Sequence, residues 1–202
     1  DRVGLACCDY VVTEAGFGAD MGAEKFFNIK CRQSGLTPDA ALLVCTVRAM
    51  KFHSGRFEIK PGKPLPPELS QEDVSAVEEG IPNLEKQIAN VRQHGVPVVV
   101  AINKFPTDTD AEIDAVRKAA LAAGAEAAHV STLHADGGAG GEDLARALVD
   151  AAEGGSAEFR FLYPSDATLT EKIETIATKV YGASGVDYEP VAQEKLAQFQ
   201  EA

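Results

Sequence analysis

The sequence is poor in basic residues and contains no tryptophan. It has 19 Lys and Arg residues against 31 Asp and Glu residues, which gives a formal net charge of −12 at pH 7. Proteins that bind a phosphate backbone need clustered Lys and Arg, so this balance argues against a nucleic-acid partner. An acidic surface of this kind mainly keeps a protein soluble.

Long apolar runs and metal-site spacings are also absent. No run approaches the length of a membrane span, and the first residues lack the pattern of a secretory signal. The four cysteines, Cys7, Cys8, Cys31 and Cys45, have neither the spacing of a metal site nor a partnered His. We therefore expect buried, reduced, structural thiols, no metal site, no membrane contact and a cytoplasmic location.

The loop that cradles nucleotide phosphates, Gly-x-x-x-x-Gly-Lys-Ser/Thr, does not occur in the sequence. The sequence begins at Asp1 rather than at Met, and it ends at Ala202 inside an expected helix. We expect this chain to be a piece of a longer protein, cut at both ends. Any phosphate cradle would then lie before Asp1.

What the sequence does have is a regular alternation of apolar and amphipathic segments. The clearest apolar run, residues 96–102, is rich in β-branched residues and is typical of a strand buried on both faces. Similar patterns predict further strands at 5–13, 40–47, 125–131 and 159–163. Amphipathic spacing and capping residues predict helices at 23–32, 71–80, 82–94, 109–124, 142–153, 168–182 and from 190 onward.

This order predicts an α/β fold with a mainly parallel, doubly wound sheet. Residues 1–163 would form the α/β segment, with a Pro-rich insertion at 55–69, and residues 164–202 a C-terminal helical segment. In open α/β sheets, ligands bind at the carboxyl ends of the strands. We therefore expect the loops at 14–22, 103–108 and 131–141 to lie near one another.

The loop after the central strand, residues 103–108, carries more chemistry than a turn needs. Its Asn103-Lys104 pair resembles the base-recognition loop of GTP-binding proteins, in which the pattern is Asn-Lys-any-Asp. Here Pro106 takes the fourth position, and the acid arrives two residues late at Asp108. The chain thus resembles the second half of a P-loop NTPase-like fold without guanine specificity. For Asp108, contact with the loop or ligand and capping of the next helix both remain open.

The turn at 14–22 is rich in glycine, which lets the backbone turn tightly and approach a ligand closely. Asp20 is a candidate N-cap for the helix that follows, and amides at such a junction attract anions. Phe17 stands between Gly16 and Gly18, an unusual position for a packing residue. We expect Phe17 to contact a ligand, with a simple turn as the alternative.

Three basic residues follow the strand predicted at 40–47, namely Arg48, Lys51 and His53. At the carboxyl end of a strand they are able to meet a phosphate or a carboxylate. A solvated surface role is the alternative for each, and we favour it for Lys51 and His53.

Four stretches closely resemble formate–tetrahydrofolate ligase: residues 9–30, residues 98–108, the glycines of 137–141 and residues 171–188. The resemblance covers essentially all 202 residues, and TEAGFGAD and FPTDT are long, specific motifs. A complete member of that family is more than twice as long. Its phosphate loop precedes the matching segment and a further stretch follows it, so the resemblance places this chain in the middle of the enzyme.

The resemblance implies an activity and its cofactors. Members of the family use ATP, Mg²⁺ and formate to form formyl phosphate, which reacts with the N10 amine of tetrahydrofolate. The products are 10-formyltetrahydrofolate, ADP and phosphate. A monovalent cation is left open, and the family implies a homo-oligomer, a tetramer. The alternative is a non-catalytic folate- or nucleotide-binding fragment of a P-loop-type fold.

The resemblance also implies site residues. Phe105 supported by Pro106, together with Thr107, would form one wall of the folate site. His134 would face them, at a position where the family usually has Trp. The residues implied for the nucleotide and formyl phosphate are Phe17, Gly18, Ala19, Asp20 and Asn103. The catalytic residues that bind phosphate would lie outside this chain, so we expect the isolated chain to be inactive.

Overall fold

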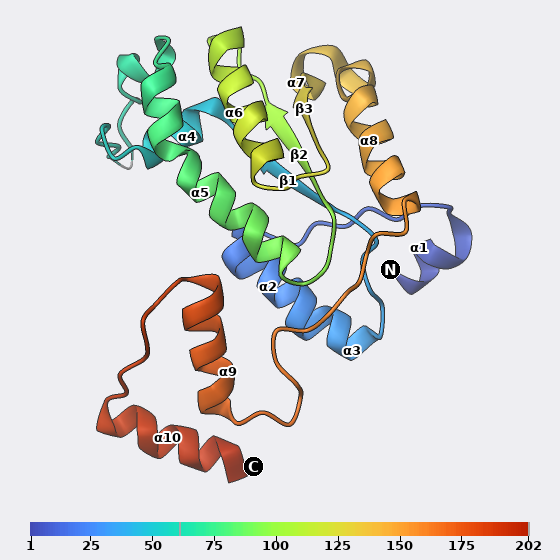
Figure 1. Ribbon diagram of the computed structural model, residues 1–202, viewed down its shortest axis with the longest axis vertical. Helices are drawn as coiled ribbons and strands as arrows, with labels where there is room; N and C mark the ends of the chain where they lie inside the picture. The colour runs from blue at the N-terminus through green and yellow to red at the C-terminus, as the bar shows by residue number, and fades with distance from the viewer. Residues whose placement is uncertain (61, 202) are drawn as a thin grey trace.

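The structure is a computed structural model that describes residues 1–60 and 62–201. Its centre is a parallel sheet of three strands in the order β1 (Ala41–Cys45), β2 (Val98–Asn103) and β3 (Ala127–Ser131). Two helices, α5 (Val74–Arg92) and α6 (Asp110–Ala122), cover one face, and α8 (Glu142–Glu153) lies on the other (Figure 1). The predicted α/β architecture with a parallel sheet is therefore confirmed. A P-loop NTPase-like arrangement stays a prediction.

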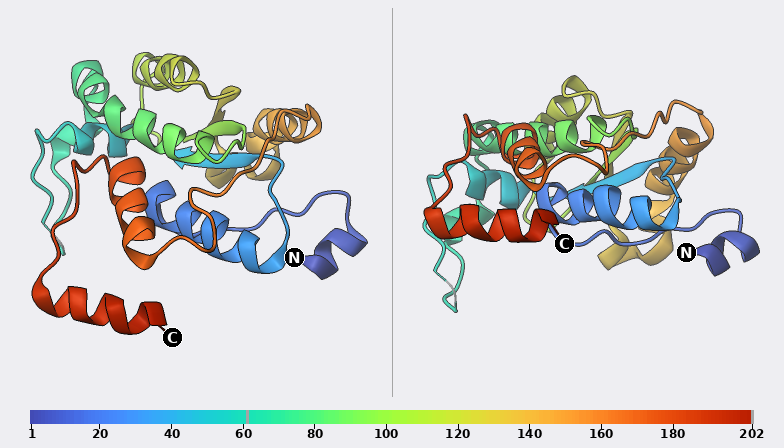
Figure 2. Two further views of the ribbon diagram at one scale, coloured as in Figure 1. Left: turned by 60° about the horizontal axis from the view of Figure 1, so that its bottom comes forward. Right: turned by 90° about the horizontal axis from the view of Figure 1, so that it is seen from below.

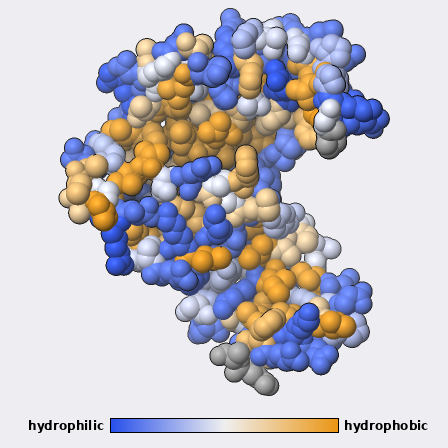
Figure 3. Space-filling view, turned by 180° about the vertical axis from the view of Figure 1, so that it is seen from behind, coloured by the Kyte–Doolittle hydropathy of each residue, from blue (hydrophilic) through white to orange (hydrophobic). Residues whose placement is uncertain are grey.

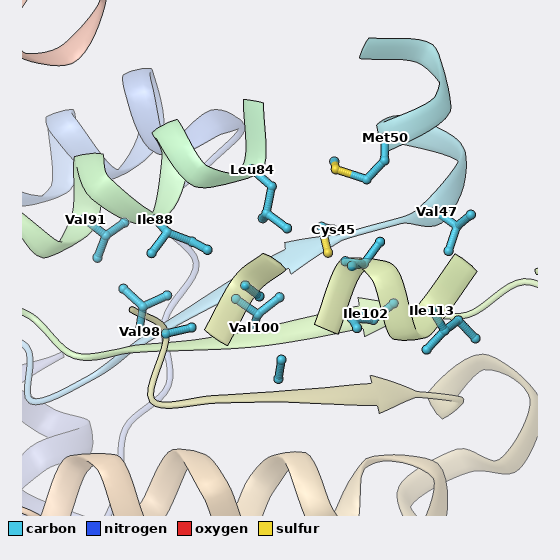
Figure 4. Close-up of a cluster of buried hydrophobic side chains, with 14 of the residues drawn as sticks. Cys45, Val47, Met50, Leu84, Ile88, Val91, Val98, Val100, Ile102 and Ile113 are labelled. Carbon is cyan, nitrogen blue, oxygen red and sulfur yellow. The ribbon is translucent and has the colours of Figure 1, made fainter. Parts of the chain in front are cut away.

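Strand β2 is buried on both faces, as the run at 96–102 predicts. Val98, Val100 and Ile102 point toward α5, α6 and the short helix α4 (Val47–His53) (Figure 4). Val99 and Ala101 point the other way and pack near Leu144 of α8. Full burial of a Val or Ile side chain contributes about 1.5–3 kcal/mol, so β2 anchors both layers.

Strand β1 is covered on one face only. Leu42 and Val44 pair in register with Val99 and Ala101 and share their side of the sheet, but α8 packs against β2 and β3. Leu42 is therefore 38% exposed and Val44 61% exposed. Seen from behind, the upper part of the molecule has a hollow in which hydrophobic residues gather (Figure 3).

The helix predicted at 23–32 is longer than expected. It runs without a break through η1 (Gly18–Gly22), α2 (Ala23–Lys25), η2 (Phe26–Cys31) and α3 (Arg32–Ser34), and Gly35 ends it with a φ of 71°. Asp20 lies inside its first turn, so the prediction of Asp20 as N-cap is wrong. The helix can start earlier because Gly22 packs on the preceding turn, where a Cβ would come within 2.6 Å of the Gly16 carbonyl oxygen.

The two helices predicted at 71–80 and 82–94 are one helix, α5, with Pro82 inside it. Pro82 is exposed, and its position faces away from the sheet, whereas Val77, Leu84 and Ile88 form a continuous buried stripe. Packing of that stripe maintains the helix across the proline, although proline alone would favour a break. The helix also starts at Val74 rather than at residue 71. Asp73 is its N-cap, and the Asp73 carboxylate accepts a 2.8 Å hydrogen bond from the Ala76 amide.

Two predicted strands do not form. In place of the strand at 5–13, the structure has α1 (Arg2–Cys7) and an irregular segment in which Val12 is 78% exposed. Residues 159–163 are also irregular, although the Glu158 and Arg160 amides donate to the Gly95 and His94 carbonyls. Their apolar side chains pack elsewhere, as the ring of Phe159 against Phe27 shows. A strand forms only where another strand pairs with it, and an apolar pattern does not show whether such a partner exists. Both errors have this cause.

The cysteine prediction is correct for two of four thiols. Cys31 and Cys45 are buried, and burial raises the pKa of the Cys45 thiol to about 12. Cys7 and Cys8 are exposed, contrary to the prediction, because the segment that carries them is not a strand of the sheet.

The remaining helices lie at the edges of this core. They are η3 (Pro67–Ser70), α7 (Leu133–Asp136), η4 (Gly137–Gly141), α9 (Leu169–Thr175), η5 (Ile176–Val180) and α10 (Pro190–Glu201). Within the Pro-rich insertion predicted at 55–69, Pro61 lies outside the described residues, as does Ala202 at the end of the segment 164–202. Within 1–60 and 62–201, no helix is both long and apolar enough to cross a membrane.

The C-terminal helices stand away from the sheet (Figure 2). Helix α9 begins with a complete capping box between Thr168 and Glu171, as the sequence predicts. The Lys86 ammonium group donates a hydrogen bond of 2.7 Å to the Lys179 carbonyl, which ties η5 to α5. The division of the chain at residue 163 stays a prediction.

Candidate functional site

Two of the three loops expected at the sheet edge meet there. Asn103 at the end of β2 pairs in register with Ser131 at the end of β3. The Lys104 amide then donates to the Ser131 carbonyl at 3.0 Å, which joins the loop at 103–108 to the loop at 131–141. The second loop is folded back on itself, since the Thr132 amide donates to the Gly140 carbonyl at 3.0 Å. Parallel pairing of β2 and β3 is the cause of this meeting.

Asp108 shapes the first loop. Its carboxylate accepts a 2.8 Å hydrogen bond from the Phe105 amide, and its own amide donates to the Phe105 carbonyl at 3.0 Å. Of the two roles left open for Asp108, capping of the next helix belongs instead to Thr109, which forms a capping box with Glu112. Asp108 thus closes the turn, and Pro106 and Thr107 remain exposed at its tip.

The Phe105 ring is half-buried and lies against a cation. The guanidinium carbon of Arg48 is 4.5 Å from the centre of the ring. Arg48 belongs to α4, which starts directly after β1, the other neighbour of β2. The sequence placed Arg48 at a strand end but contained no local sign of this contact.

His134 stands on the facing loop and is exposed, as part of the four-residue helix α7. The glycines after it allow the loop to close, because a Cβ on Gly140 would come within 2.5 Å of the Thr132 hydroxyl oxygen. His134 and Phe105 therefore occupy neighbouring loops at one edge. Their sequence-based assignment to folate stays a prediction.

A buried ion pair lies beneath this edge. The Lys51 ammonium group is 2.5 Å from the Glu112 carboxylate, and the two side chains are 1% and 0% exposed. The expectation that Lys51 is a solvated surface group is wrong, because α5 and α6 pack over α4 and enclose it. Burial alone would raise the pKa of Glu112, but the bonds from Lys51 and the Asp73 and Thr109 amides lower it. The spacing of Thr109 and Glu112 is that of a capping box, but it contains no sign of the contact between Glu112 and Lys51.

The turn that carries Phe17 does not join the edge formed by the other two loops. Phe17 is 91% exposed, and the turn follows no strand. Asp20 lies near Tyr181 of the C-terminal segment, whose pKa is raised by burial and also by the Asp20 carboxylate. Among residues 1–60 and 62–201, no hydrogen bond or ring contact links this turn to the other two loops. The assignments of Phe17, Gly18, Ala19 and Asp20 stay predictions.

The two clearest depressions on the described part of the chain do not lie at the edge formed by the two loops. These shallow depressions, of about 500 and 530 Å³, lie at the helix 18–34 and at residues 162–179, away from Phe105 and His134. In the described part of the chain, no group of three or more His, Cys, Asp or Glu residues is placed to hold a metal ion. What the edge offers is an aromatic face, a cation and exposed polar groups.

Comparison with known proteins agrees with the motifs found in the sequence. A family model described as formate–tetrahydrofolate ligase matches residues 1–202. The chain is 56% identical over 200 residues to a formate–tetrahydrofolate ligase of Saccharopolyspora erythraea, covering 99% of this chain. It is 55% identical over 201 residues to that of Cutibacterium acnes, and 52% identical to that of Desulforamulus reducens, each over 100% of this chain.

The chain spans 35% of the length of each of these relatives. The match is nevertheless continuous over the sheet, both loops of the edge and the C-terminal helices. The chain therefore belongs to the formate–tetrahydrofolate ligase family.

Proposed function

We propose that this chain is a part of an ATP-dependent formate–tetrahydrofolate ligase and supplies part of the tetrahydrofolate site. The complete enzyme would join formate to tetrahydrofolate through formyl phosphate and release ADP and phosphate. In this chain, Phe105, Pro106 and Thr107 would line one side of the folate, and His134 the other.

The observation that carries the proposal is the position of Phe105. A pterin ring is flat and largely apolar, and it binds well to an aromatic face whose own position is fixed. The turn bonds between Phe105 and Asp108 fix the backbone at this position. The ring is partly exposed, and its loop is joined to the His134 loop by the Lys104–Ser131 backbone bond.

The phosphates of ATP fit this chain less well. At the start of the helix 18–34, free amides would suit an anion, but the Asp20 carboxylate lies beside them. A Cβ on Gly18 would be only 2.4 Å from Asp20 Oδ1. The negative charge of Asp20 would repel a phosphate, so no step of phosphoryl transfer is assigned to Phe17, Gly18, Ala19 or Asp20. ATP when bound supplies the activated phosphoryl group, and the sequence of this chain contains no loop of the type that cradles it.

The uncovered face of β1 supports the view that a larger enzyme completes this layer. Leu42 and Val44 are apolar and exposed on the side of the sheet where α8 covers β2 and β3. An apolar sheet face normally packs against another layer. The relatives have about two thirds of their length outside the matched part, which is ample for such a layer.

The test is to replace Phe105 by Ala in a complete ligase that carries this segment. We expect the KM for tetrahydrofolate to rise by about tenfold, which corresponds to the loss of one aromatic stacking contact. The KM for ATP should change by less than about twofold. Phe52→Ala is the matched control, because Phe52 is 42% exposed on α4 and its ring contacts the neighbouring His53. Equal increases in both KM values would show that Phe105 only packs.

The alternative, a non-catalytic binding fragment, applies to the chain in isolation. We expect the 202-residue chain to form no 10-formyltetrahydrofolate from formate, ATP and tetrahydrofolate, while it retains weak folate binding. Product formation at the rate of a complete ligase would contradict this expectation and our interpretation of the missing phosphate loop.

A further inference from the structure

We propose that Arg48 is a positioning residue, which holds the Phe105 ring in the orientation that the folate wall needs. The proposal rests on the proposed function, since Phe105 is the residue through which Arg48 would act. It assigns a role to a residue of α4, an element that the motifs of the site do not include.

The sheet brings the two residues together. Cys45 of β1 pairs in register with Ile102 of β2, and Arg48 and Phe105 each lie three residues beyond that pair. Because the two strands are parallel, their following residues leave the sheet at the same edge. The distance of 4.5 Å from the guanidinium carbon to the ring centre is within the range of cation–π stacking.

Arg48 is unusual among the arginines of this acidic chain. Each of the other seven donates a hydrogen bond to a carbonyl or carboxylate oxygen; they are Arg2, Arg32, Arg56, Arg92, Arg117, Arg146 and Arg160. Within residues 1–60 and 62–201, Arg48 has no such bond and no ion pair. Its guanidinium group lies over the Phe105 ring. A guanidinium group is planar and weakly hydrated, so it stacks on a ring without an acidic partner.

The backbone and the ring of Phe105 are thus held by different groups. Asp108 fixes the main chain of the turn through two hydrogen bonds. Neither bond restricts rotation of the half-buried ring about its side-chain torsions. Arg48 covers one face of the ring, so a stacked ligand would have to use the part of the ring that remains exposed. Without Arg48, the ring would sample other orientations, and folate binding would include the cost of ordering it.

The first experiment measures kinetics in a complete ligase that carries this segment. Arg48→Gln should raise the KM for tetrahydrofolate by about three- to tenfold, with less than a twofold change for ATP. Arg48→Lys keeps the positive charge but loses the planar guanidinium group, so its KM for tetrahydrofolate should fall between those of the wild type and Arg48→Gln. Arg117→Gln is the control, because Arg117 pairs with Asp114 on the outer side of α6. In a Phe105→Ala background, Arg48→Gln should have no further effect, a non-additivity that a general loss of stability would not produce.

The second experiment observes the ring directly and does not depend on folate. A 4-fluorophenylalanine placed at position 105 of the same enzyme should show a ¹⁹F resonance that moves in Arg48→Gln and stays in place in Arg117→Gln. An unchanged resonance, or an equal effect of Arg48→Gln with and without Phe105, would overturn the proposal for Arg48. A resonance that moves while Phe105→Ala leaves the KM for tetrahydrofolate unchanged would instead overturn the proposed folate role, and with it the functional part of this inference.

Discussion

Removal of the Lys51 ammonium group should destabilise the chain strongly, because that group is fully bonded in a dry environment. It donates to the Leu69 carbonyl at 3.2 Å, to the Gln71 carbonyl at 2.6 Å and to Glu112 Oε1 at 2.5 Å. These three acceptors satisfy all of its donors. Lys51→Met retains much of the side-chain length but leaves the Glu112 charge buried without its cation.

The expected cost is about 3–5 kcal/mol, the usual range when one member of a buried ion pair is removed. Glu112 keeps bonds from the Asp73 amide at 2.8 Å and the Thr109 amide at 3.0 Å, which favours the lower end of that range. A typical domain has 5–15 kcal/mol of stability in total, so even about 3 kcal/mol is a large fraction. Lys51→Met combined with Glu112→Leu should cost less than either single change, because no charge is then buried.

The assay is urea unfolding of the wild type and the three variants, followed by circular dichroism. The pH dependence gives a second readout. The pKa of Glu112 is lowered in the folded chain, so its stabilising contribution is present above the ordinary value of 4.5 and is lost as the pH falls through the lowered pKa. In Lys51→Met, burial should instead raise the Glu112 pKa, and the gap between variant and wild type should narrow in acid. A loss below about 1 kcal/mol, or a gap that widens in acid, would refute this reasoning.

Other features of the structure lead to three further predictions. Gly80→Ala should destabilise the chain by more than about 2 kcal/mol in urea, because its Cβ would lie 1.8 Å from the Met50 carbonyl oxygen. A thiol reagent should label exposed Cys7 rapidly in the native chain and buried Cys45, with a pKa of about 12, only after unfolding. Burial lowers the pKa of His94 below 6.5, so stability should fall as the pH drops below that value, and His94→Gln should remove this part of the pH profile.

Much of the fold could be predicted because its signals are local. The β-branched run at 96–102 indicates burial on both faces, and the capping box at Thr109 marks the start of α6. The helix Glu142–Glu153 has the bounds that the sequence predicts. In each case the residues that determine the element lie within a few positions of one another, so their spacing in the sequence is enough to predict it.

The errors arise where a distant partner decides the outcome. The apolar residues at 5–13 predict a buried strand, but a strand needs a neighbour, and none pairs with them here. Pro82 predicts a helix boundary, but the buried stripe of α5 packs across it. The sequence predicts that Lys51 is a surface residue, but in the structure α5 and α6 cover it.

The sequence by itself determined the family, a parallel sheet and two of the three loops expected at its carboxyl edge, because motifs and strand order follow directly from the order of residues. Only the tertiary structure decided which side chains face one another across that edge. Arg48 and Phe105 are 57 positions apart, and they meet because β1 and β2 pair with Cys45 opposite Ile102. The pairing register of β1 and β2 depends on how the whole core packs, so it cannot be predicted from a short stretch of sequence.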